Sequence, residues 1–497
     1  MQLEIRTTGL MLILGLLFMP LSIFSQNAPA KVSVDWNKVT AVSKTVVSIE
    51  VDPEPPMLRS SPIHDQLFKV LLDLHPDYAR MVTWYPWPRM GIAELKPPEN
   101  GKTYWDFSLM DEYTEDFMKA TEGHPVVIDF STIPEWMFKT KAPVAYPEDP
   151  NQIDWDYEQG TELRDPSMKE VADYQARLVG WYTKGGFNDE YGKWHASGHH
   201  YKIAYWEVLN EMEHNLSPEY YTRLYDAIVE RVRQVSPQMR FIGLALADTL
   251  TEPDYFTYFL DPKHHKPGIP IDMISYHYYY GPDSDETPET MQYTIFNGAD
   301  TFLTAARYID SIRKRLSPRT GTYIDELGVI LPDGTAPQLA HPIPDSYWNL
   351  AGAMWAYMYG GLAGLGVEVA GGAELIDYPG MFAGTTLVNW ETGQPNAHYW
   401  VLKLLRDNFG PGDKLVETKL ETPQVYAQAF ITPQGKHKIL LVNKRDKSVE
   451  LTIAGAAGGQ VQKVDQSTAS SPPVTSGVAQ DALSLRGLAV AVVTLPR

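Results

Sequence analysis

The chain has 497 residues, of which 44% are hydrophobic and 21% charged, as in a globular protein rather than a disordered or fibrous one. Its formal net charge of −20 disfavours nucleic acid as a partner, because such a surface repels phosphate backbones. The chain contains no cysteine, which excludes disulfides, thiol nucleophiles and thiolate metal sites.

The N-terminus has the pattern of a signal peptide. Arg6 supplies a basic charge, residues 10–24 form an uncharged apolar run, and small and polar residues follow at 25–30. The apolar run is short for a membrane span, and Pro20 interrupts it. We therefore predict a signal peptide at residues 1–26, a secreted or periplasmic protein, and no stable membrane insertion after cleavage. An uncleaved anchor is the alternative.

Apolar strand-like segments alternate with amphipathic helical segments along most of the chain. After a short strand-like run at 32–36, the predicted strands are 45–51, 79–84, 126–130, 203–209, 241–245, 273–278, 321–324 and 364–369. The predicted helices are 63–74, 109–121, 168–183, 218–235, 299–316, 346–359 and 395–408. This order predicts an α/β fold, a (β/α)8 TIM barrel over residues 27–412. An open doubly wound sheet is the alternative, but its usual Gly-rich phosphate turn is absent.

The sequence changes character near residue 415. Short β-rich runs at 424–432, 437–443, 448–454, 461–463 and 488–495 are separated by Gly, Pro, Asp and Ser. This pattern predicts an antiparallel β-sandwich domain at residues 413–497.

Asn210 and Glu211 end the predicted fourth barrel strand. Active sites of TIM barrels lie at this end of the strands, where a carboxyl group can serve as a general acid. Because side chains alternate along a strand, Asn210 and Glu211 reach one cleft only if the strand end bulges or turns. A glutamate that merely caps the next loop is the structural alternative.

Asp325 and Glu326 end the predicted seventh strand. A retaining glycosidase needs two carboxyl groups about 5–5.5 Å apart, one as nucleophile and one as acid/base. Strands four and seven would place Glu211 and Glu326 across the barrel mouth. Alternation should turn Asp325 toward the helices, so we predict that Glu326 rather than Asp325 is the second carboxylate of the pair.

Further residues are candidates for binding a substrate. His277 and Tyr279 share one side of the predicted sixth strand, where the imidazole could bind sugar hydroxyls and the phenol could orient a carboxylate. Arg80, on the second strand, would favour an ionised nucleophile nearby. Trp84 and Trp136 lie at or beyond strand ends and could stack on sugar rings. A core aromatic cluster or ordinary packing is the alternative in each case.

Metal and serine chemistry are poorly supported. The pairs His199-His200 and His264-His265 lack the i, i+4 spacing of a helical metal site, and we predict neither a metal ion nor a cofactor. The G-x-S-x-G motif of serine hydrolases is also absent.

In chain order, these residues resemble motifs of the clan A glycoside hydrolases, most closely family 39, which includes β-xylosidases and α-L-iduronidases. The resembling segments are Arg80, residues 104–107 with Asp111, residues 133–136, Trp206 to Glu211, His277 with Tyr279, Asp325 with Glu326, and residues 389–397. The resemblance covers about residues 45–497, because those relatives also end in a β-sandwich. It implies that Glu211 is the acid/base, Asn210 holds the sugar 2-hydroxyl, and Glu326 is the nucleophile.

Two positions depart from the family pattern, since Met212 replaces a common Pro and Leu209 a common Trp. These departures bear on the substrate more than on the chemistry. The sequence thus indicates a secreted retaining glycoside hydrolase with a carbohydrate substrate. The alternatives are a non-catalytic carbohydrate-binding barrel and a transglycosylase that uses the same residues. The acidic loops 140–164 and 281–298 are expected to shape the cleft and to disfavour a uronic acid.

Overall fold

The computed structural model describes residues 28–142, 146–155, 157, 160–247, 249 and 252–496. The predicted signal peptide, residues 1–26, lies outside this part of the chain. None of the helices within it combines the length and apolarity that a membrane span requires.

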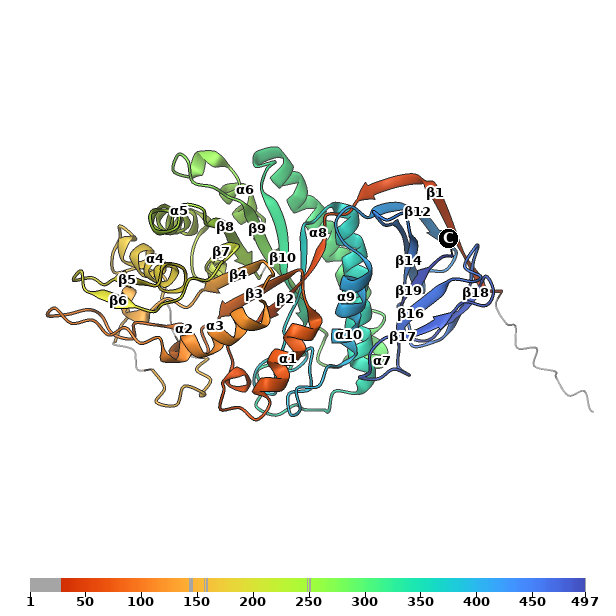
Figure 1. The fold of residues 1–497 in the computed structure, drawn as a ribbon, viewed down its shortest axis with the longest axis horizontal. Coiled ribbons are helices and arrows are strands. Elements are labelled where there is room, and N and C mark those ends of the chain that lie inside the picture. The colour runs from red at the N-terminus through yellow and green to blue at the C-terminus, as the bar shows by residue number, and fades with distance from the viewer. Residues whose placement is uncertain are drawn as a thin grey trace, which may run out of the picture.

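Eight parallel strands close into a barrel, so the predicted TIM-barrel fold is confirmed (Figure 1). The last strand pairs with the first through Gly372 and Ile49. The predicted fourth and seventh strands are β7 and β10. In chain order the barrel strands are β2 (Val46–Val51), β3 (Tyr78–Thr83), β4 (Val126–Phe130), β7 (Tyr205–Val208), β8 (Arg240–Leu246), β9 (Met273–Tyr280), β10 (Gly321–Val329) and β11 (Val369–Gly372).

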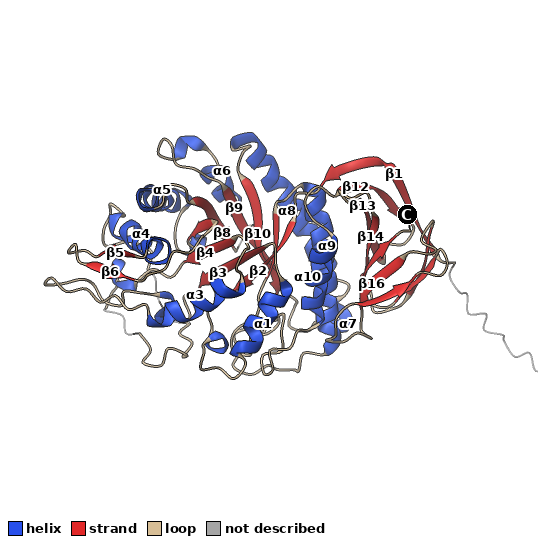
Figure 2. Cartoon of the chain, viewed as in Figure 1, coloured by secondary structure: helices blue, strands red, loops and turns tan. Residues whose placement is uncertain are grey.

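Helices surround the barrel (Figure 2). They pack through apolar stripes, and α5 shows how one begins: Ser217 accepts the N–H of Tyr220, and Pro218 occupies the first turn. The longer helices are α1 (His64–Leu74), α3 (Ser108–Ala120), α4 (Lys169–Lys184), α5 (Pro218–Val235), α8 (Ile295–Leu316), α9 (Asp345–Leu365) and α10 (Ala397–Asn408). Shorter ones are α2 (Pro88–Gly91), α6 (Pro253–Phe259) and α7 (Pro288–Met291).

The end of the barrel differs from the prediction. The strand expected at 364–369 begins only at Val369, because α9 continues to Leu365. Gly366 then ends the helix in the left-handed region, at φ 80°. The unbroken apolar composition of this segment concealed the boundary, since periodicity alone does not separate a buried helix from a buried strand.

The second domain is a mostly antiparallel sheet, as predicted. Its core includes Val32, Leu441, Ile453 and Val493. Its strands are β12 (Lys414–Leu420), β13 (Val425–Ile431), β14 (His437–Asn443), β15 (Val449–Ile453), β16 (Gln460–Val464), β17 (Val474–Gly477), β18 (Ala482–Leu485), β19 (Val490–Thr494) and also β1 (Ala30–Val42).

The position of β1 differs from the expectation that residues 27–412 form the barrel. This strand pairs antiparallel with β12 and parallel with β15, so it lies in the second domain (Figure 1). The described part of the chain therefore begins in the second domain, forms the barrel, and ends in the second domain again. A short hairpin, β5 (Gly186–Asn188) with β6 (Trp194–Ala196), projects from the barrel after α4.

The barrel interior has two layers of different character. The layer toward the N-terminal ends of the strands is apolar and includes Val127, Tyr205, Ile242, Met273, Tyr323 and Val369. Two residues further along four of these strands, on the same side, stand Asp129, Glu207, Ser275 and Asp325, all buried. The upper layer is thus built from polar and charged side chains, and it supports the mouth of the barrel.

Candidate active site

Arg80, on β3, is the centre of the upper layer. Its side chain is fully buried, and Nη1 donates to Glu326 Oε1 at 2.7 Å and to Glu50. Nε donates to Glu207 Oε2 at 2.6 Å, and Nη2 to Asn210 Oδ1 at 2.7 Å. Burial alone would lower the pKa of Arg80, but the surrounding carboxylates raise it well above its ordinary value. Arg80 is therefore a permanent cation that holds several side chains at once.

Glu326 lies on β10 beside this cation. The register between β10 and β9 shifts after Ile324, so that β10 has one extra residue at this point. Asp325 and Glu326 therefore both point inward: Asp325 Oδ2 lies 3.5 Å from Arg80 Nη2. The prediction that Asp325 faces the helices is wrong: Asp325 follows the alternation from Tyr323 and points inward, and the bulge brings Glu326 to the same side. Gly371 allows this bulge, since a Cβ there would lie 2.2 Å from the Asp325 carbonyl oxygen.

The charge state of Glu326 follows from its neighbours. Burial would raise the pKa of this carboxyl, but the charges of His277 and Arg80 outweigh burial and lower the pKa to about 2. Tyr279 adds a hydrogen bond, with its hydroxyl donating to Glu326 Oε2 at 2.6 Å. Glu326 is therefore ionised across the physiological range.

Glu211 reaches the same place by a turn of the backbone. Strand β7 ends at Val208, and Leu209 and Glu211 then adopt positive φ values of 67° and 53°. The Glu211 N–H donates to the Ala245 carbonyl at 3.0 Å, which fixes the turn. Such conformations are costly for residues with a side chain and are concentrated at functional sites. This turn brings Asn210 and Glu211 to one cleft.

His277 bridges the two carboxylates. Its Nδ1 lies 3.2 Å from Glu211 Oε1 and 3.0 Å from Glu326 Oε2, and its Nε2 lies 3.3 Å from Asp325 Oδ2. Burial would lower the pKa of His277, but Glu326 and Asp325 raise it well above its ordinary value. The buried side chain is thus an imidazolium that positions carboxylates. A residue that binds sugar hydroxyls would line the cleft, and His277 is not among the described residues that line it.

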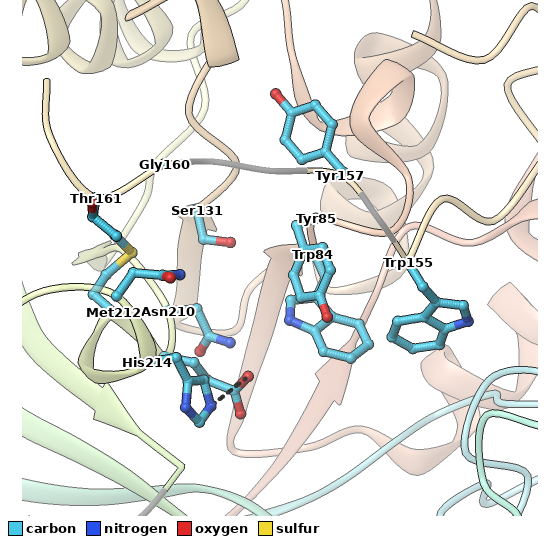
Figure 3. Close-up of a pocket in the computed structure, with 12 residues that line it drawn as sticks. Trp84, Tyr85, Ser131, Trp155, Tyr157, Gly160, Thr161, Asn210, Met212 and His214 are labelled. Carbon is cyan, nitrogen blue, oxygen red and sulfur yellow. Dashed lines mark ion pairs between the residues drawn. The ribbon is translucent and has the colours of Figure 1, made fainter. Parts of the chain in front are cut away.

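Two adjoining cavities, of about 530 and 420 Å³, form the cleft at the barrel mouth. Trp84, Tyr85, Asn210, Glu211 and other residues line both, whereas Glu326 lines only the second. Figure 3 shows the first cavity, with the aromatic rings on one side and Asn210 and His214 on the other. His214 Nε2 lies 3.9 Å from Glu211 Oε2. Glu211 therefore stands where the two cavities meet.

The predicted tryptophans have different positions. Trp84 lines both cavities and packs against Trp155, with ring centroids 5.4 Å apart. Trp136 lines neither: its indole N–H donates to the Glu94 carbonyl at 2.8 Å, and Arg164 covers its ring at 4.4 Å. The structure therefore does not bring Trp136 to the cleft. It is instead used in the packing of the loop that follows β4.

Sequence reasoning missed four carboxylates that line the second cavity beyond Glu326. Glu50 and Asp52 stand at the end of β2, and Glu374 and Asp377 follow β11. Burial raises the pKa of all four well above the ordinary range. We call these four residues the acidic wall. The alternation of Ser48, Glu50 and Asp52 with apolar residues was a signal for polar groups facing into the barrel.

Two groups of side chains have the donor types of a metal site: Glu211 with His277 and Glu326, and Glu50 with Asp52 and Glu374. In the first group the His277 imidazolium already supplies a positive charge between the carboxylates. This group therefore fits a proton-bearing histidine better than a metal ion, whose ligand would be neutral imidazole.

No protein-family model matches the chain, and no curated protein matches it by sequence. Solved structures do match. An α-L-arabinofuranosidase from Thermotoga maritima, in complex with arabinose, has a TM-score of 0.60 at 15% identity, over 94% of this chain and 99% of that one. The family 51 α-L-arabinofuranosidase AbfB from Bifidobacterium longum has a TM-score of 0.63 at 12% identity, over 94% and 100%. A GH30 endoxylanase from Clostridium papyrosolvens has 0.56 at 13%, over 94% and 100%.

These matches span both domains, and they show that the barrel and the sheet together form the same fold as in these three enzymes. At this level of identity the likeness concerns the fold. The names of the second and third structures give families 51 and 30, so family 39 stays a prediction from the motifs.

Proposed function

We propose that the chain is a retaining glycoside hydrolase, with Glu326 as the nucleophile and Glu211 as the acid/base. One observation carries the proposal: carboxylate oxygens of Glu211 and Glu326 lie within 4.8 Å of each other across the barrel mouth. Retaining enzymes hold their carboxyl groups roughly 5–5.5 Å apart, whereas inverting enzymes leave room for a water molecule at about 6.5–9.5 Å.

The chemistry is a double displacement. Glu326 attacks the anomeric carbon while Glu211 donates its proton to the glycosidic oxygen, so that the leaving group departs as an alcohol and a glycosyl ester forms. Glu211 then takes a proton from water, whose oxygen attacks the same carbon and breaks the ester. Glu326 leaves as a carboxylate and Glu211 is again protonated.

The neighbours of Glu326 suit the nucleophile's role. Arg80 and Tyr279 both donate to it, which keeps it ionised and fixes its orientation. Asn210 Oδ1 is engaged by Arg80, so its amide N–H groups are the ones that can serve a sugar hydroxyl, as the family resemblance implies for the 2-hydroxyl. Trp84 supplies an aromatic face in both cavities.

The cleft also suggests how a glycan would lie. The nucleophile attacks the sugar whose bond is cleaved, and that sugar would therefore occupy the second cavity, beside Glu326. The leaving group would lie in the first cavity, because the acid/base Glu211 stands between the two.

The finer assignments belong to the proposal as well. The motifs from Arg80 to Glu326 favour family 39 within the clan. The apolar run at residues 10–24 favours export, with residues 1–26 as the signal peptide. Mass spectrometry of the N-terminus, after expression in a secreting host, tests cleavage, and an intact Met1 on exported protein would contradict it.

Hydrolysis of a panel of plant and microbial glycans tests the activity, with the anomer of the first product followed by NMR. We expect retention of configuration, and we expect Glu326→Ala and Glu211→Ala to lose activity. Full activity in either variant would overturn the assignment of that residue, and an inverted product would overturn the mechanism. Products lengthened at high acceptor concentration would reveal a transglycosylase, and binding without turnover would reveal a carbohydrate-binding barrel.

A further inference from the structure

The acidic wall holds more carboxyl groups than a retaining mechanism needs. Six carboxylates line the second cavity, namely the four of the wall together with Glu211 and Glu326. Within the described part of the chain, no Lys or Arg side chain lines this cavity. Arg80 lies beneath it, but its guanidinium is already shared among Glu326, Glu50, Glu207 and Asn210.

The closure of the barrel assembles the wall. Glu50 and Asp52 come from the first barrel strand and Glu374 follows the last one, and the pairing of β11 with β2 places oxygens of all three within 4.8 Å of one another. Glu374 is held by two backbone groups: its Oε1 accepts the N–H of Asp52 at 3.0 Å and that of Leu375 at 2.9 Å. The wall is therefore a fixed part of the cavity.

Part of this acidic cluster lacks a donor. Asp52 Oδ1 is inaccessible to solvent and accepts no hydrogen bond from the described residues. Glu54 lies fully buried behind the wall, and within the same part of the chain no backbone, hydroxyl or amide group donates to either of its oxygens. Asp377 receives the Thr385 hydroxyl. Buried acceptors without donors are costly, and buried carboxylates without a counter-charge are more so.

A neutral sugar does not stabilise the ionised form of these buried carboxyl groups, because each hydroxyl brings a single donor and no charge. An ammonium group brings three N–H donors and a positive charge on one compact atom. Its attraction to carboxylates a few ångströms away is stronger beside buried protein groups such as Glu50 and Glu374 than in bulk water. A carboxylated sugar would be repelled for the same reason, in keeping with the acidity of the surrounding loops.

We propose that the second cavity selects a glycan with a free amino group, that is, an amino sugar without its N-acetyl group, whose ammonium binds the acidic wall. This proposal rests on the proposed function, since it places that sugar beside the nucleophile Glu326. Asp52 and Glu374 are the residues that discriminate, because both line the cavity and neither contacts Arg80 directly.

The test uses 4-nitrophenyl glycosides in three matched forms: free amine, N-acetyl and hydroxyl, as both anomers of the gluco and galacto sugars, with the amine at C2, C3 or C4. We expect at least one free-amine substrate to exceed its hydroxyl counterpart in kcat/KM by about tenfold or more, since close charge pairs at interfaces reach such values. In Asp52→Asn and Glu374→Gln this ratio should fall by about tenfold. Glu450→Gln, an exposed position in the second domain with the same loss of charge, should keep it.

The outcomes separate the two proposals. Hydrolysis of hydroxyl substrates without any preference for free amines would overturn the amino-sugar inference and leave the glycosidase intact. If no substrate is cleaved, calorimetry measures the binding of the corresponding thioglycosides. Binding of the free-amine compound that is equal to or weaker than that of its hydroxyl counterpart overturns the inference. A variant that unfolds is replaced by the other wall variant, with circular dichroism as the check.

A divalent cation is the competing occupant of the wall. Purified protein is dialysed against EDTA, and its melting temperature and activity are measured with and without 1 mM Ca²⁺ or Mg²⁺. We expect no stabilisation. A rise in melting temperature with Ca²⁺ that is lost in Asp52→Asn would make the wall a metal site and overturn the amino-sugar inference.

Discussion

The two layers of the barrel interior differ in chemistry although the same strands build them. In the lower layer Val127, Ile242 and Val369 fill the barrel with apolar packing. In the upper layer Arg80 lies among carboxylates at hydrogen-bond distance. Buried ions cost stability unless they are paired and rigidly held. The comparison indicates that the packed lower layer supports an upper layer selected for charge placement rather than for stability.

The largest expected contrast is between Arg80→Met and Ile242→Ala. Arg80→Met leaves buried carboxylates without their cation and should lower the free energy of unfolding by about 3–5 kcal/mol. It should also raise the pKa of Glu326 from about 2, so that the acid limb of kcat/KM moves to higher pH. Ile242→Ala creates a cavity at a cost of about 2–5 kcal/mol.

Urea unfolding and pH–rate profiles measure both variants. The Ile242→Ala profile should match the wild type, because this residue touches the packing and not the charges. An equal shift of the pH profile in the two variants would contradict the division into layers, as would an unchanged profile in Arg80→Met.

Tyr279→Phe sharpens the comparison within one strand. It removes the hydrogen bond to Glu326, and hydrogen bonds to charged groups contribute about 1.5–3 kcal/mol, so kcat should fall roughly 10- to 150-fold. Tyr278→Phe is the matched control, since this neighbour faces the other side of β9 and its buried hydroxyl has no hydrogen-bond partner among the residues that the structure describes. Comparable losses in both variants would show that the aromatic packing of β9 matters, rather than the hydroxyl on Glu326.

Glu374→Gln tests how the free energy of unfolding depends on the ionisation of a buried carboxyl group in the upper layer. The pKa of Glu374 is raised in the folded state above its ordinary value of 4.5, so the folded protein retains a proton that the unfolded chain releases. Because of this carboxyl, the free energy of unfolding therefore falls as the pH rises above about 4.5. Glutamine keeps the two backbone hydrogen bonds and never ionises.

The free energy of unfolding of Glu374→Gln should therefore exceed that of the wild type at pH 7, by about 1.4 kcal/mol for each unit of pKa shift, and the two should converge toward pH 4. Urea titrations at four pH values measure this difference. A difference in the free energy of unfolding that does not change with pH would contradict the conclusion that it arises from ionisation of Glu374.

Two tryptophans give the smallest expected effects. Trp84→Ala should raise KM about tenfold, because an aromatic face in the cleft is lost. Trp136→Ala should leave KM within about twofold and act only on stability, because the ring packs under Arg164 outside both cavities. Initial rates on the best substrate give KM for both variants. A larger change in KM for Trp136→Ala would indicate that Trp136 contacts the substrate after all.

The order of the elements and the strands that carry or precede Glu211 and Glu326 were predictable from the sequence, because apolar periodicity and polar residues after apolar runs are local signals. The bulge that brings Glu326 to the same side as Asp325 was not predictable, since this depends on the register between β10 and β9. The acidic wall was not predicted from the sequence for a similar reason. Glu50 and Glu374 lie at opposite ends of the barrel sequence, and only the pairing of β11 with β2 brings them together.

The pairing of β1 with the second domain was also beyond local reasoning. A strand-like run at 32–36 carries no mark of its partner, and here the partner, β12, lies at Lys414–Leu420. Trp136 was misplaced because a tryptophan after a strand end is equally suited to a cleft and to loop packing. In each case the missing information was a contact between distant segments.

The most direct test of the catalytic pair is azide rescue of two alanine variants on an activated aryl glycoside. In Glu211→Ala the nucleophile remains, so azide should replace water in the second step and give a glycosyl azide with retained configuration. In Glu326→Ala azide should enter the space of the missing carboxylate and give the inverted azide. The same anomer from both variants, or no rescue in either, would contradict the assignment of Glu326 as nucleophile and Glu211 as acid/base.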